Sequence, residues 1–381
     1  MNQISSLLSD AVARRAVPFV VATALDEKGV RVEAAAGEAR PGMAAAPDTV
    51  FRIFSQTKAV GALAAMILIE RRLLNFDMPV SDILPSFAEL PVLEGFAGDE
   101  PRLRRQQGVA TIAHLATHTS GLAYEYWNAD ITRWMELTGH PTVFSGKLAA
   151  LDYPLVADPG TAWHYGPGVD WLGRVVETVD GRRIDAFCRD EIFAPLGMDD
   201  TVFEVEGERA ERLAEVHARQ EDGFRPARGG PARNPEFYGM GHALYSTPRD
   251  YGRFLRMMLG GGALDGNRIL SAQGVAAMLA ARTGGISVPR MSSVAPRVSR
   301  DFEPFPGRRV SHSMAFARLE DDLPGRRRAG AQFWAGALNT HCWLDPAAGI
   351  AGLFMTQLAP FADPALAQAY DAFEEAVYAA G

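Results

Sequence analysis

Strand-like segments at the two ends of the chain constrain its fold more than any other feature. Near the N-terminus, residues 19–25 and 30–36 are rich in Val and Ala and flank a turn-forming Asp-Glu-Lys-Gly quartet. Near the C-terminus, residues 331–344 and 350–357 flank a short segment that contains Pro and Gly. Both patterns predict hairpins. Because the hairpins stand at opposite ends of the chain, we expect one antiparallel sheet that the chain leaves and re-enters.

Helical patterns accompany these strands. Residues 1–15 place apolar side chains on one helical face, and a final helix begins with Asp363 as its cap and Pro364 in its first turn. The middle of the chain carries helical periodicity and many turn signals. Residues 223–235 and 284–309 are rich in Gly, Pro, Ser and Arg and lack either period, so we expect loops there.

These patterns predict an α/β (α+β) fold with two domains. Residues 1–75 and 236–381 are expected to form a discontinuous domain in which helices flank the antiparallel sheet. Residues 76–235 are expected to form a mainly helical domain. An active site would lie at the interface between them.

Composition excludes several classes of partner. The 381 residues include 38 Lys and Arg against 46 Asp and Glu, so there is no basic surplus for nucleic acid or an anionic membrane. The apolar run over residues 59–69 is about half of the roughly 20 residues that a membrane span needs, and predicts a buried helix. The N-terminus has no signal-peptide pattern, and Cys188 and Cys342 lie far apart. We expect a cytoplasmic protein that binds neither nucleic acid nor membrane; its oligomeric state is not predicted.

A serine and a lysine precede the buried helix in the sequence Phe-Ser-Gln-Thr-Lys. Residues three apart on a helix share a face, so Lys58 can reach the hydroxyl of Ser55. A serine nucleophile needs a group that takes its proton, and an apolar environment disfavours the charged form of lysine. Free backbone N–H groups at the start of a helix also stabilise an oxyanion. The pattern therefore indicates nucleophilic catalysis.

This pattern alone leaves an alternative open, because Ser-x-x-Lys arises by chance in long chains and serine is a common helix cap. Two further segments bear on the choice. Residues 163–168 read Trp-His-Tyr-Gly-Pro-Gly before a predicted helix, and residues 333–337 read Phe-Trp-Ala-Gly-Ala on a predicted strand.

Together the three segments resemble the serine β-lactamase and penicillin-binding-protein superfamily. Within it, the chain looks most like the class C β-lactamase-related esterases, the family VIII carboxylesterases. Residues 115–122, 194–198, 239–241 and 245–251 are similar to further family segments, and the likeness extends from about residue 10 to residue 378. The resemblance implies the family's antiparallel sheet with flanking helices and a helical domain.

The resemblance also implies roles for individual residues. Ser55 would be the nucleophile and Lys58 the group that activates it. Tyr165 matches the tyrosine of the family's Tyr-x-Asn motif, which shares proton transfer with the lysine. Whether Lys58 or Tyr165 is the base in the resting enzyme stays open. The backbone N–H groups of Ser55 and Ala337 would form the oxyanion hole.

Departures from the β-lactamase pattern bear on the substrate. Trp334-Ala335-Gly336 stands where those enzymes have Lys-Thr-Gly, so the cation that would pair with a substrate carboxylate is missing. Gly166-Pro167 follows Tyr165, so the amide of Tyr-x-Asn is missing as well. Both departures favour a neutral acyl ester. A second segment, Arg-Thr-Gly at residues 282–284, follows a helix-like stretch and is not expected to replace the motif.

Aromatic residues in loops that border the cleft of family members are candidates for substrate binding. Together with Trp334 and Gly336, the candidates are Tyr124, Tyr126, Trp127, Phe237, Tyr238, Met240 and His242. The alternative is that these side chains pack beneath long loops. Asp170, just after the tyrosine motif, is predicted as part of a helix start.

Other chemistry has less support. The chain has no Gly-x-Ser-x-Gly, and no Gly-x-Gly-x-x-Gly follows a strand. His114 and His118 stand four residues apart without an acidic residue between them, so we expect neither a metal nor a cofactor.

The predicted function is a serine carboxylesterase that hydrolyses small, neutral, short-chain esters through a Ser55 acyl-enzyme. The alternatives are a β-lactamase, an amide hydrolase or an acyltransferase on the same scaffold. A non-catalytic binding protein is the alternative of a different class, and loss of Ser55, Lys58 or Tyr165 would have favoured it.

Overall fold

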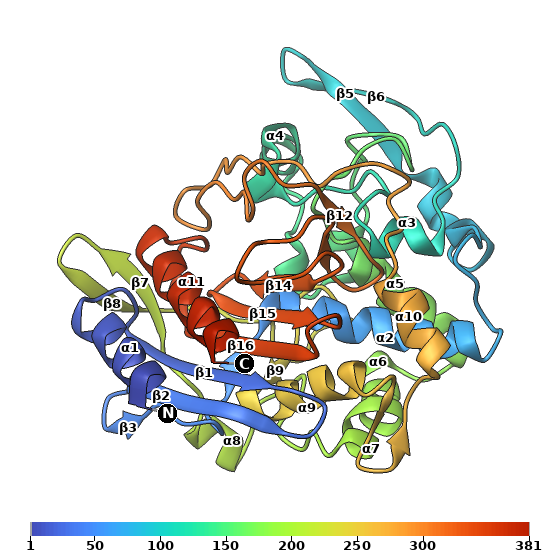
Figure 1. The fold of residues 1–381 in the computed structure, drawn as a ribbon. Coiled ribbons are helices and arrows are strands. Elements are labelled where there is room, and N and C mark those ends of the chain that lie inside the picture. The colour runs from blue at the N-terminus through green and yellow to red at the C-terminus, as the bar shows by residue number, and fades with distance from the viewer. Residues whose placement is uncertain (1, 381) are drawn as a thin grey trace.

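An eight-stranded antiparallel sheet forms the centre of the computed structural model, which describes residues 2–380 (Figure 1). In order across the sheet, the strands are β12 (Val310–His312), β13 (Ala317–Leu319), β14 (Gln332–Gly336), β15 (Thr340–Asp345), β16 (Ile350–Met355), β1 (Phe19–Leu25), β2 (Val30–Arg40) and β3 (Met43–Ala44). The N-terminal strand β1 pairs with the C-terminal strand β16, with Val21 opposite Met355. The predicted sheet built from both ends of the chain is thus confirmed.

Helices from both ends pack together beside this sheet. The N-terminal helix α1 (Asn2–Ala13) contacts the C-terminal helix α11 (Pro364–Ala379), which crosses in front of the strands in Figure 1. Asp363 caps α11, as predicted, and accepts hydrogen bonds from the backbone N–H groups of Ala365 and Leu366. Helix α9 (Pro248–Leu259) contacts β1 and β16. Every residue of β1 is buried, so the sheet is covered on both faces there.

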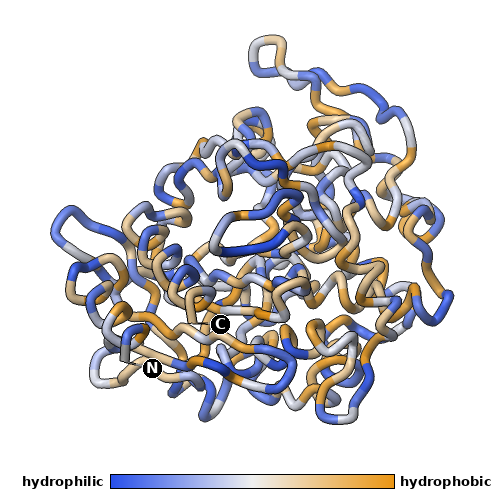
Figure 2. Tube along the Cα trace, in the orientation of Figure 1, coloured by the Kyte–Doolittle hydropathy of each residue, from blue (hydrophilic) through white to orange (hydrophobic). Residues whose placement is uncertain are grey.

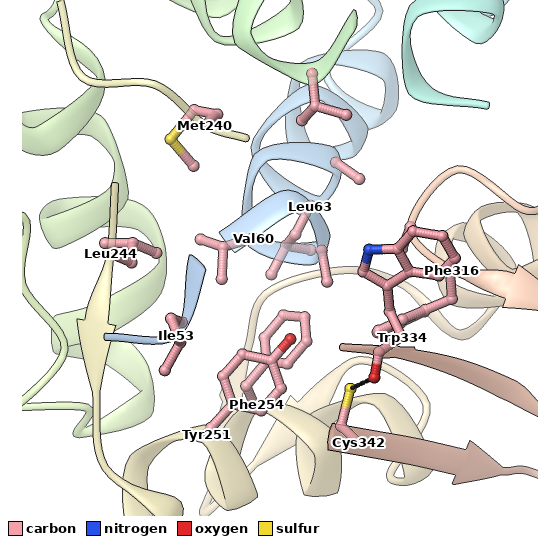
Figure 3. Packing of buried hydrophobic residues seen from close by; sticks show 14 of the residues in the cluster. Ile53, Val60, Leu63, Met240, Leu244, Tyr251, Phe254, Phe316, Trp334 and Cys342 are labelled. Carbon is pink, nitrogen blue, oxygen red and sulfur yellow. Dashed lines mark hydrogen bonds between the residues drawn. The ribbon is translucent and has the colours of Figure 1, made fainter. Parts of the chain in front are cut away.

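Helix α2 (Thr57–Glu70) runs through the interior, as its apolar sequence predicts. All of its residues from Thr57 to Leu68 are buried. Figure 3 shows Val60 and Leu63 of this helix between Met240 on one side and the rings of α9 on the other. The helix is therefore a rigid support for the turn that precedes it.

Residues 76–235 contain short helices together with two hairpins. The helices are α3 (Ile112–Ala116), α4 (Ala129–Thr138), α5 (Gly168–Asp180), α6 (Ile184–Cys188), α7 (Ala194–Leu196) and α8 (Glu208–Glu211). The hairpins are β5 (Pro91–Ala97) with β6 (Glu100–Arg105), which projects from the body of the molecule in Figure 1, and β7 (Val216–Gln220) with β8 (Gly223–Ala227). The division into two domains at residues 75 and 235 remains a prediction.

The remaining elements are short. They are helix α10 (Ala272–Leu279) and the strand pairs β4 (Phe51–Arg52) with β9 (Tyr245–Ser246) and β10 (Ala263–Leu264) with β11 (Asn267–Arg268), and strand β17 (Leu358–Ala359), which runs parallel to β7.

Two expectations from the sequence are corrected. Residues 331–344 form two strands, β14 and β15, because Asn339 takes a left-handed φ of 60° and turns the chain between them. Residues 223–227 were expected in a loop but form β8, whose pairing with β7 overrides a composition rich in Gly and Pro.

Apolar segments gather in the centre of the molecule, and hydrophilic segments lie toward its projecting ends (Figure 2). Both cysteines are buried and free. Within residues 2–380, no helix has the length and apolar character that crossing a membrane requires.

Candidate active site

A strained turn carries Ser55. Residues Phe54–Gln56 form a 3₁₀ turn, and α2 begins directly after it at Thr57. Phe54 has a φ of 42°, in the left-handed region that residues other than glycine rarely adopt. Strain of this kind persists where the surrounding structure imposes it, commonly at functional sites.

Three polar side chains meet at this turn. The Nζ of Lys58 lies 3.1 Å from the Oγ of Ser55, one helical turn away as the spacing predicts. The hydroxyl of Tyr165, which stands just before α5, lies 2.6 Å from the same Oγ. All three side chains are buried. The structure therefore brings together a hydroxyl, an amine and a phenol from distant parts of the sequence.

The Nζ of Lys58 has three hydrogen-bond acceptors. Besides Ser55 Oγ, they are the hydroxyl of Tyr124 at 3.1 Å and the backbone oxygen of Gly241 at 2.8 Å. An ammonium group has three N–H donors and no acceptor. The three oxygen atoms can therefore accept from all three donors of an ammonium group.

Tyr165 receives a second polar contact, from Trp334 on β14. The indole Nε1 donates a hydrogen bond of 3.3 Å to the tyrosine hydroxyl. The tyrosine oxygen therefore lies between the Ser55 hydroxyl and the indole N–H, a donor that stabilises negative charge on an oxygen it contacts.

Two buried histidines complete the wall behind Tyr165. The ring of His118 lies 4.8 Å from that of Tyr165 and 5.0 Å from that of His312. Burial holds the pKa of His118 well below its ordinary value and lowers the pKa of His312 to about 4. Both rings are thus neutral near pH 7, and neither supplies a cation to the site.

The end of β14 closes the site on the other side. Gly336 and Ala337 line the same cavity as Ser55. A Cβ atom at Gly336 would lie 2.2 Å from the backbone oxygen of Ile53, so only glycine allows the strand to approach the Ser55 turn this closely. The two backbone segments that the sequence nominates for an oxyanion hole are therefore side by side.

A narrow apolar cavity opens above Ser55. The volume accessible within it is about 30 Å³. It is lined by Ser55, Tyr126, Trp127, Tyr165, Met291, Val298, Ser299, Phe302, Trp334, Ala335, Gly336, Ala337 and Phe361. None of these lining residues carries a charged side chain.

Some of the predicted substrate-binding residues line this cavity and others do not. Tyr126, Trp127, Trp334 and Gly336 do. Tyr124 instead lies beneath the cavity, where its hydroxyl accepts a hydrogen bond from Lys58.

The four candidates between residues 237 and 242 lie outside the lining of this cavity. Phe237 and Met240 are buried in the core, and Met240 contacts α2 and α5 at Gly61 and Gly173. Tyr238 packs on Phe203, and His242 packs on Phe144. Hydrophobic packing, the alternative reading of these residues, describes Phe237, Tyr238 and Met240.

The sequence analysis missed the outer wall of the cavity. Met291, Val298, Ser299 and Phe302 come from the 284–309 loop, and Phe361 follows β17. A loop without periodicity gives no signal for which of its side chains turn inward.

Metal ligation has no support in the part of the chain that the structure describes. No group of three or more His, Cys, Asp or Glu side chains is arranged there to hold an ion. His114 instead serves the N-terminus of α3, where its ring and the hydroxyl of Thr111 form a capping box.

Comparison with known proteins identifies the family. A family model described as "Beta-lactamase" matches residues 4–376. The chain belongs to this family. Its resemblance to the serine β-lactamase and penicillin-binding-protein superfamily is thereby confirmed, and as a beta-lactamase family member it is a catalytic serine hydrolase or acyltransferase.

Relatives of this beta-lactamase family member include both transferases and an esterase. A monacolin J acid methylbutanoyltransferase of Aspergillus terreus is 32% identical over 355 residues, which cover 87% of this chain and 82% of the relative. A lovastatin esterase of Penicillium rubens is 35% identical over 56% of this chain and 55% of the relative. The unliganded structure of simvastatin synthase (LovD) from Aspergillus terreus matches 100% of this chain and 98% of its own with a TM-score of 0.85 at 28% identity.

Proposed function

We propose that this beta-lactamase family member hydrolyses small, neutral, short-chain esters through an acyl-enzyme on Ser55, like the family VIII carboxylesterases. The observation that carries the proposal is the narrow cavity above Ser55, whose lining has no charged side chain. Its aromatic walls favour an apolar acyl group by burial and dispersion. Its small volume favours a short one.

Acylation follows from the hydrogen bonds around Ser55. For this step Tyr165 must be a phenolate. The Ser55 hydroxyl gives its proton to the phenolate oxygen of Tyr165, 2.6 Å away, as its Oγ attacks the ester carbonyl carbon. Lys58 stays an ammonium throughout this step and stabilises both oxygens. The backbone N–H groups of Ser55 and Ala337 hold the oxyanion of the tetrahedral intermediate. When this intermediate collapses, the bond to the alkoxy oxygen breaks, and Tyr165 returns the proton to that oxygen.

Deacylation repeats these steps with a water molecule. Water gives one proton to Tyr165 and its oxygen attacks the acyl carbon. The bond to Ser55 Oγ then breaks, and Ser55 takes the proton back from Tyr165. The products are a carboxylic acid and the original enzyme, so no cofactor is consumed.

An alcohol in place of water would make the same site an acyltransferase. The similarity to a methylbutanoyltransferase over 87% of this chain favours this second candidate function. The chemistry requires no additional catalytic residue, because the alcohol proton follows the route of the water proton. The partition between water and alcohol then decides which reaction dominates.

A panel of p-nitrophenyl esters from acetate to palmitate, measured beside nitrocefin, tests the proposal. We expect kcat/KM for the butyrate to exceed that for nitrocefin at least roughly a hundredfold, because two polar anchors for a β-lactam are missing. Equal efficiency on both would promote the β-lactamase alternative. Adding a secondary alcohol and separating transfer from hydrolysis products by chromatography decides between esterase and acyltransferase.

The nucleophile is tested in the same assays. Ser55→Ala is expected to lose nearly all turnover while remaining folded, and an organophosphonate is expected to add its mass to Ser55 of the unsubstituted protein alone. Undiminished hydrolysis by Ser55→Ala would contradict the mechanism.

A further inference from the structure

A carboxylate lies fully buried behind the candidate active site without a lysine or arginine partner. Asp170 stands in the first turn of α5 and is 0% exposed. Within residues 2–380, no Lys or Arg nitrogen lies within 4.0 Å of its oxygens. The ring of His242 is the near neighbour, with its Nδ1 3.5 Å from Oδ1. A buried charge of this kind is costly unless several groups compensate it.

Two bridges connect this carboxylate to Lys58. In the first, the Gly241 N–H donates to Asp170 Oδ1 at 2.9 Å, while the Gly241 oxygen accepts from Lys58 Nζ at 2.8 Å. In the second, the Tyr124 hydroxyl accepts from Lys58 at 3.1 Å and lies at 3.4 Å from Asp170 Oδ2, to which it donates. Asp170 thus orients both acceptors that Lys58 uses besides Ser55.

The backbone is shaped around Asp170. A Cβ atom at Gly241 would lie 2.4 Å from Asp170 Oδ2, and one at Gly239 would lie 2.5 Å from Oδ1. Only residues without a side chain fit here, so the 239–241 segment is built to let its backbone approach this carboxylate. A purely apolar helix start would not need such an approach.

Charge compensation links the two buried groups. Burial raises the pKa of Asp170, but the nearby ring of His242, the charge of Lys58 and the Gly241 N–H together lower it below its ordinary value. Asp170 is therefore ionised at neutral pH. Its negative charge favours the ammonium form of Lys58 and disfavours negative charge on Tyr165.

We propose that Asp170 is a positioning residue for the reaction at Ser55. Through Tyr124 and Gly241 it fixes the ammonium of Lys58, and it sets the pH range in which Lys58 keeps its proton while Tyr165 accepts that of Ser55. The inference rests on the proposed acyl-enzyme mechanism. It adds that Asp170 holds Lys58 in place for proton transfer between Ser55 and Tyr165.

Other titratable groups around the network do not dominate its pH dependence. Burial raises the pKa of Tyr124, Tyr126 and Tyr153 well above its ordinary value, and holds that of His118 and His312 far below theirs. These five groups keep one charge state between about pH 6 and 9. The other titratable groups that face Asp170 or Lys58 are His242 and Tyr165.

The test compares Asp170→Asn with Asp345→Asn as a matched control. Asp345 is also 0% exposed, and its carboxylate accepts hydrogen bonds from the Arg328 and Ala348 N–H groups and the Tyr378 hydroxyl, away from the cavity. For both variants, kcat and KM for p-nitrophenyl butyrate are measured from pH 5.5 to 9.5. Phosphonate labelling of Ser55, followed by mass spectrometry, and circular dichroism report on the nucleophile and the fold.

We expect Asp170→Asn to lower kcat about ten- to hundredfold with KM changed less than about threefold. Both limbs of its pH profile should move to lower pH by about one unit, because the ammonium of Lys58 loses stabilisation and negative charge on Tyr165 gains it. Asp345→Asn should keep the profile of the unsubstituted enzyme. The inference would be overturned if kcat fell at every pH without a shift of either limb, or if the limbs shifted to higher pH.

The labelling separates failure of this inference from failure of the mechanism. If the unsubstituted enzyme hydrolyses esters without labelling at Ser55, the proposed function fails. If the phosphonate labels Ser55 of the unsubstituted enzyme and ester turnover is normal, the mechanism stands. If Asp170→Asn then has the same kcat and pH profile as Asp345→Asn, only the role of Asp170 is contradicted. Should Asp170→Asn not fold, Tyr124→Phe carries the test. It removes one bridge and is expected to move the alkaline limb to lower pH, whereas an unmoved alkaline limb would reject the bridge.

Discussion

The indole N–H of Trp334 donates a 3.3 Å hydrogen bond to the hydroxyl of Tyr165, so a residue that lines the cavity also contacts the proposed proton carrier. Trp334 stands where β-lactamases have a lysine, and its ring alone would make that position only an apolar wall. Through this hydrogen bond, the Trp334 side chain would also stabilise negative charge on the tyrosine oxygen. This relationship can be tested separately from the volume of the ring.

Trp334→Phe removes the donor and keeps an aromatic ring. We expect kcat for p-nitrophenyl butyrate to fall about tenfold or more with a modest change in KM, because a hydrogen bond to a charged group contributes about 1.5–3 kcal/mol. Trp343→Phe is the control, since Trp343 is fully buried on the neighbouring strand β15 and its indole nitrogen has no hydrogen-bond partner within residues 2–380. Trp334→Ala is expected to weaken ester turnover further without creating strong β-lactam hydrolysis. Equal kcat in Trp334→Phe and the unsubstituted enzyme would remove this role.

Substituting Lys58 and substituting Tyr165 are expected to reduce kcat by non-additive amounts. Lys58→Ala and Tyr165→Phe should each lower kcat by several orders of magnitude with modest changes in KM, since both act on the proton of Ser55. The double variant should be little worse than either single one. If its loss equalled the product of the single losses, the two groups would act independently. Tyr153→Phe, which removes a buried hydroxyl bonded to the Ala123 oxygen, controls for the loss of a tyrosine hydroxyl.

Phe302 is expected to limit acyl length. It lines the cavity, and its ring packs 5.0 Å from that of Phe361. Phe302→Ala should enlarge the cavity and raise the ratio of kcat/KM for p-nitrophenyl octanoate over butyrate by about tenfold, as each buried methylene contributes about 0.8 kcal/mol. Phe305→Ala is the control, because Phe305 belongs to the same loop but packs on Phe333, outside this cavity. An unchanged ratio in Phe302→Ala would place the end of the acyl chain elsewhere.

Asp250 is expected to make stability fall as pH rises. Burial raises its pKa to about 6, against the opposing effect of hydrogen bonds from the Thr201 hydroxyl and the Asp200 N–H. A carboxyl whose pKa is raised by folding stabilises the fold below about pH 4, and this contribution is lost as pH rises through 6. Asp250→Asn should therefore gain roughly 2–3 kcal/mol at pH 8 relative to pH 4 in denaturant unfolding. The exposed Asp10→Asn serves as control; the same difference there would contradict the assignment.

The parts of the site that sequence reasoning predicted are those fixed by short-range geometry. The contact of Lys58 with Ser55 follows from helical spacing, and the structure gives it at 3.1 Å. The meeting of Tyr165 with Ser55 spans 110 positions and could be expected only from the family resemblance. The hydrogen bond from Trp334 was not predicted, because a strand pattern does not give the direction in which an indole nitrogen points.

The cavity walls were predicted less well, for a physical reason. Aromatic residues in loops have the same composition whether they line a pocket or fill the core, and Met240 shows the second outcome by packing against Gly61. The loop residues Val298 and Phe302 show the opposite case, since their segment carried no period that could mark an inward face. The sheet itself was predicted because hairpin turns and apolar strands are local signals.

The pairing of β1 with β16 has a consequence for how the chain folds during synthesis. Val21 pairs with Ala35 on the β2 side, but on its other side it has no strand partner until Met355 has been made. The N-terminal hairpin and helix α2 therefore keep apolar surface exposed through most of translation. The Ser55 turn waits as well, because Gly336 and Ala337 close its cavity from the last part of the chain. We therefore expect a C-terminally truncated chain to be inactive and prone to aggregate.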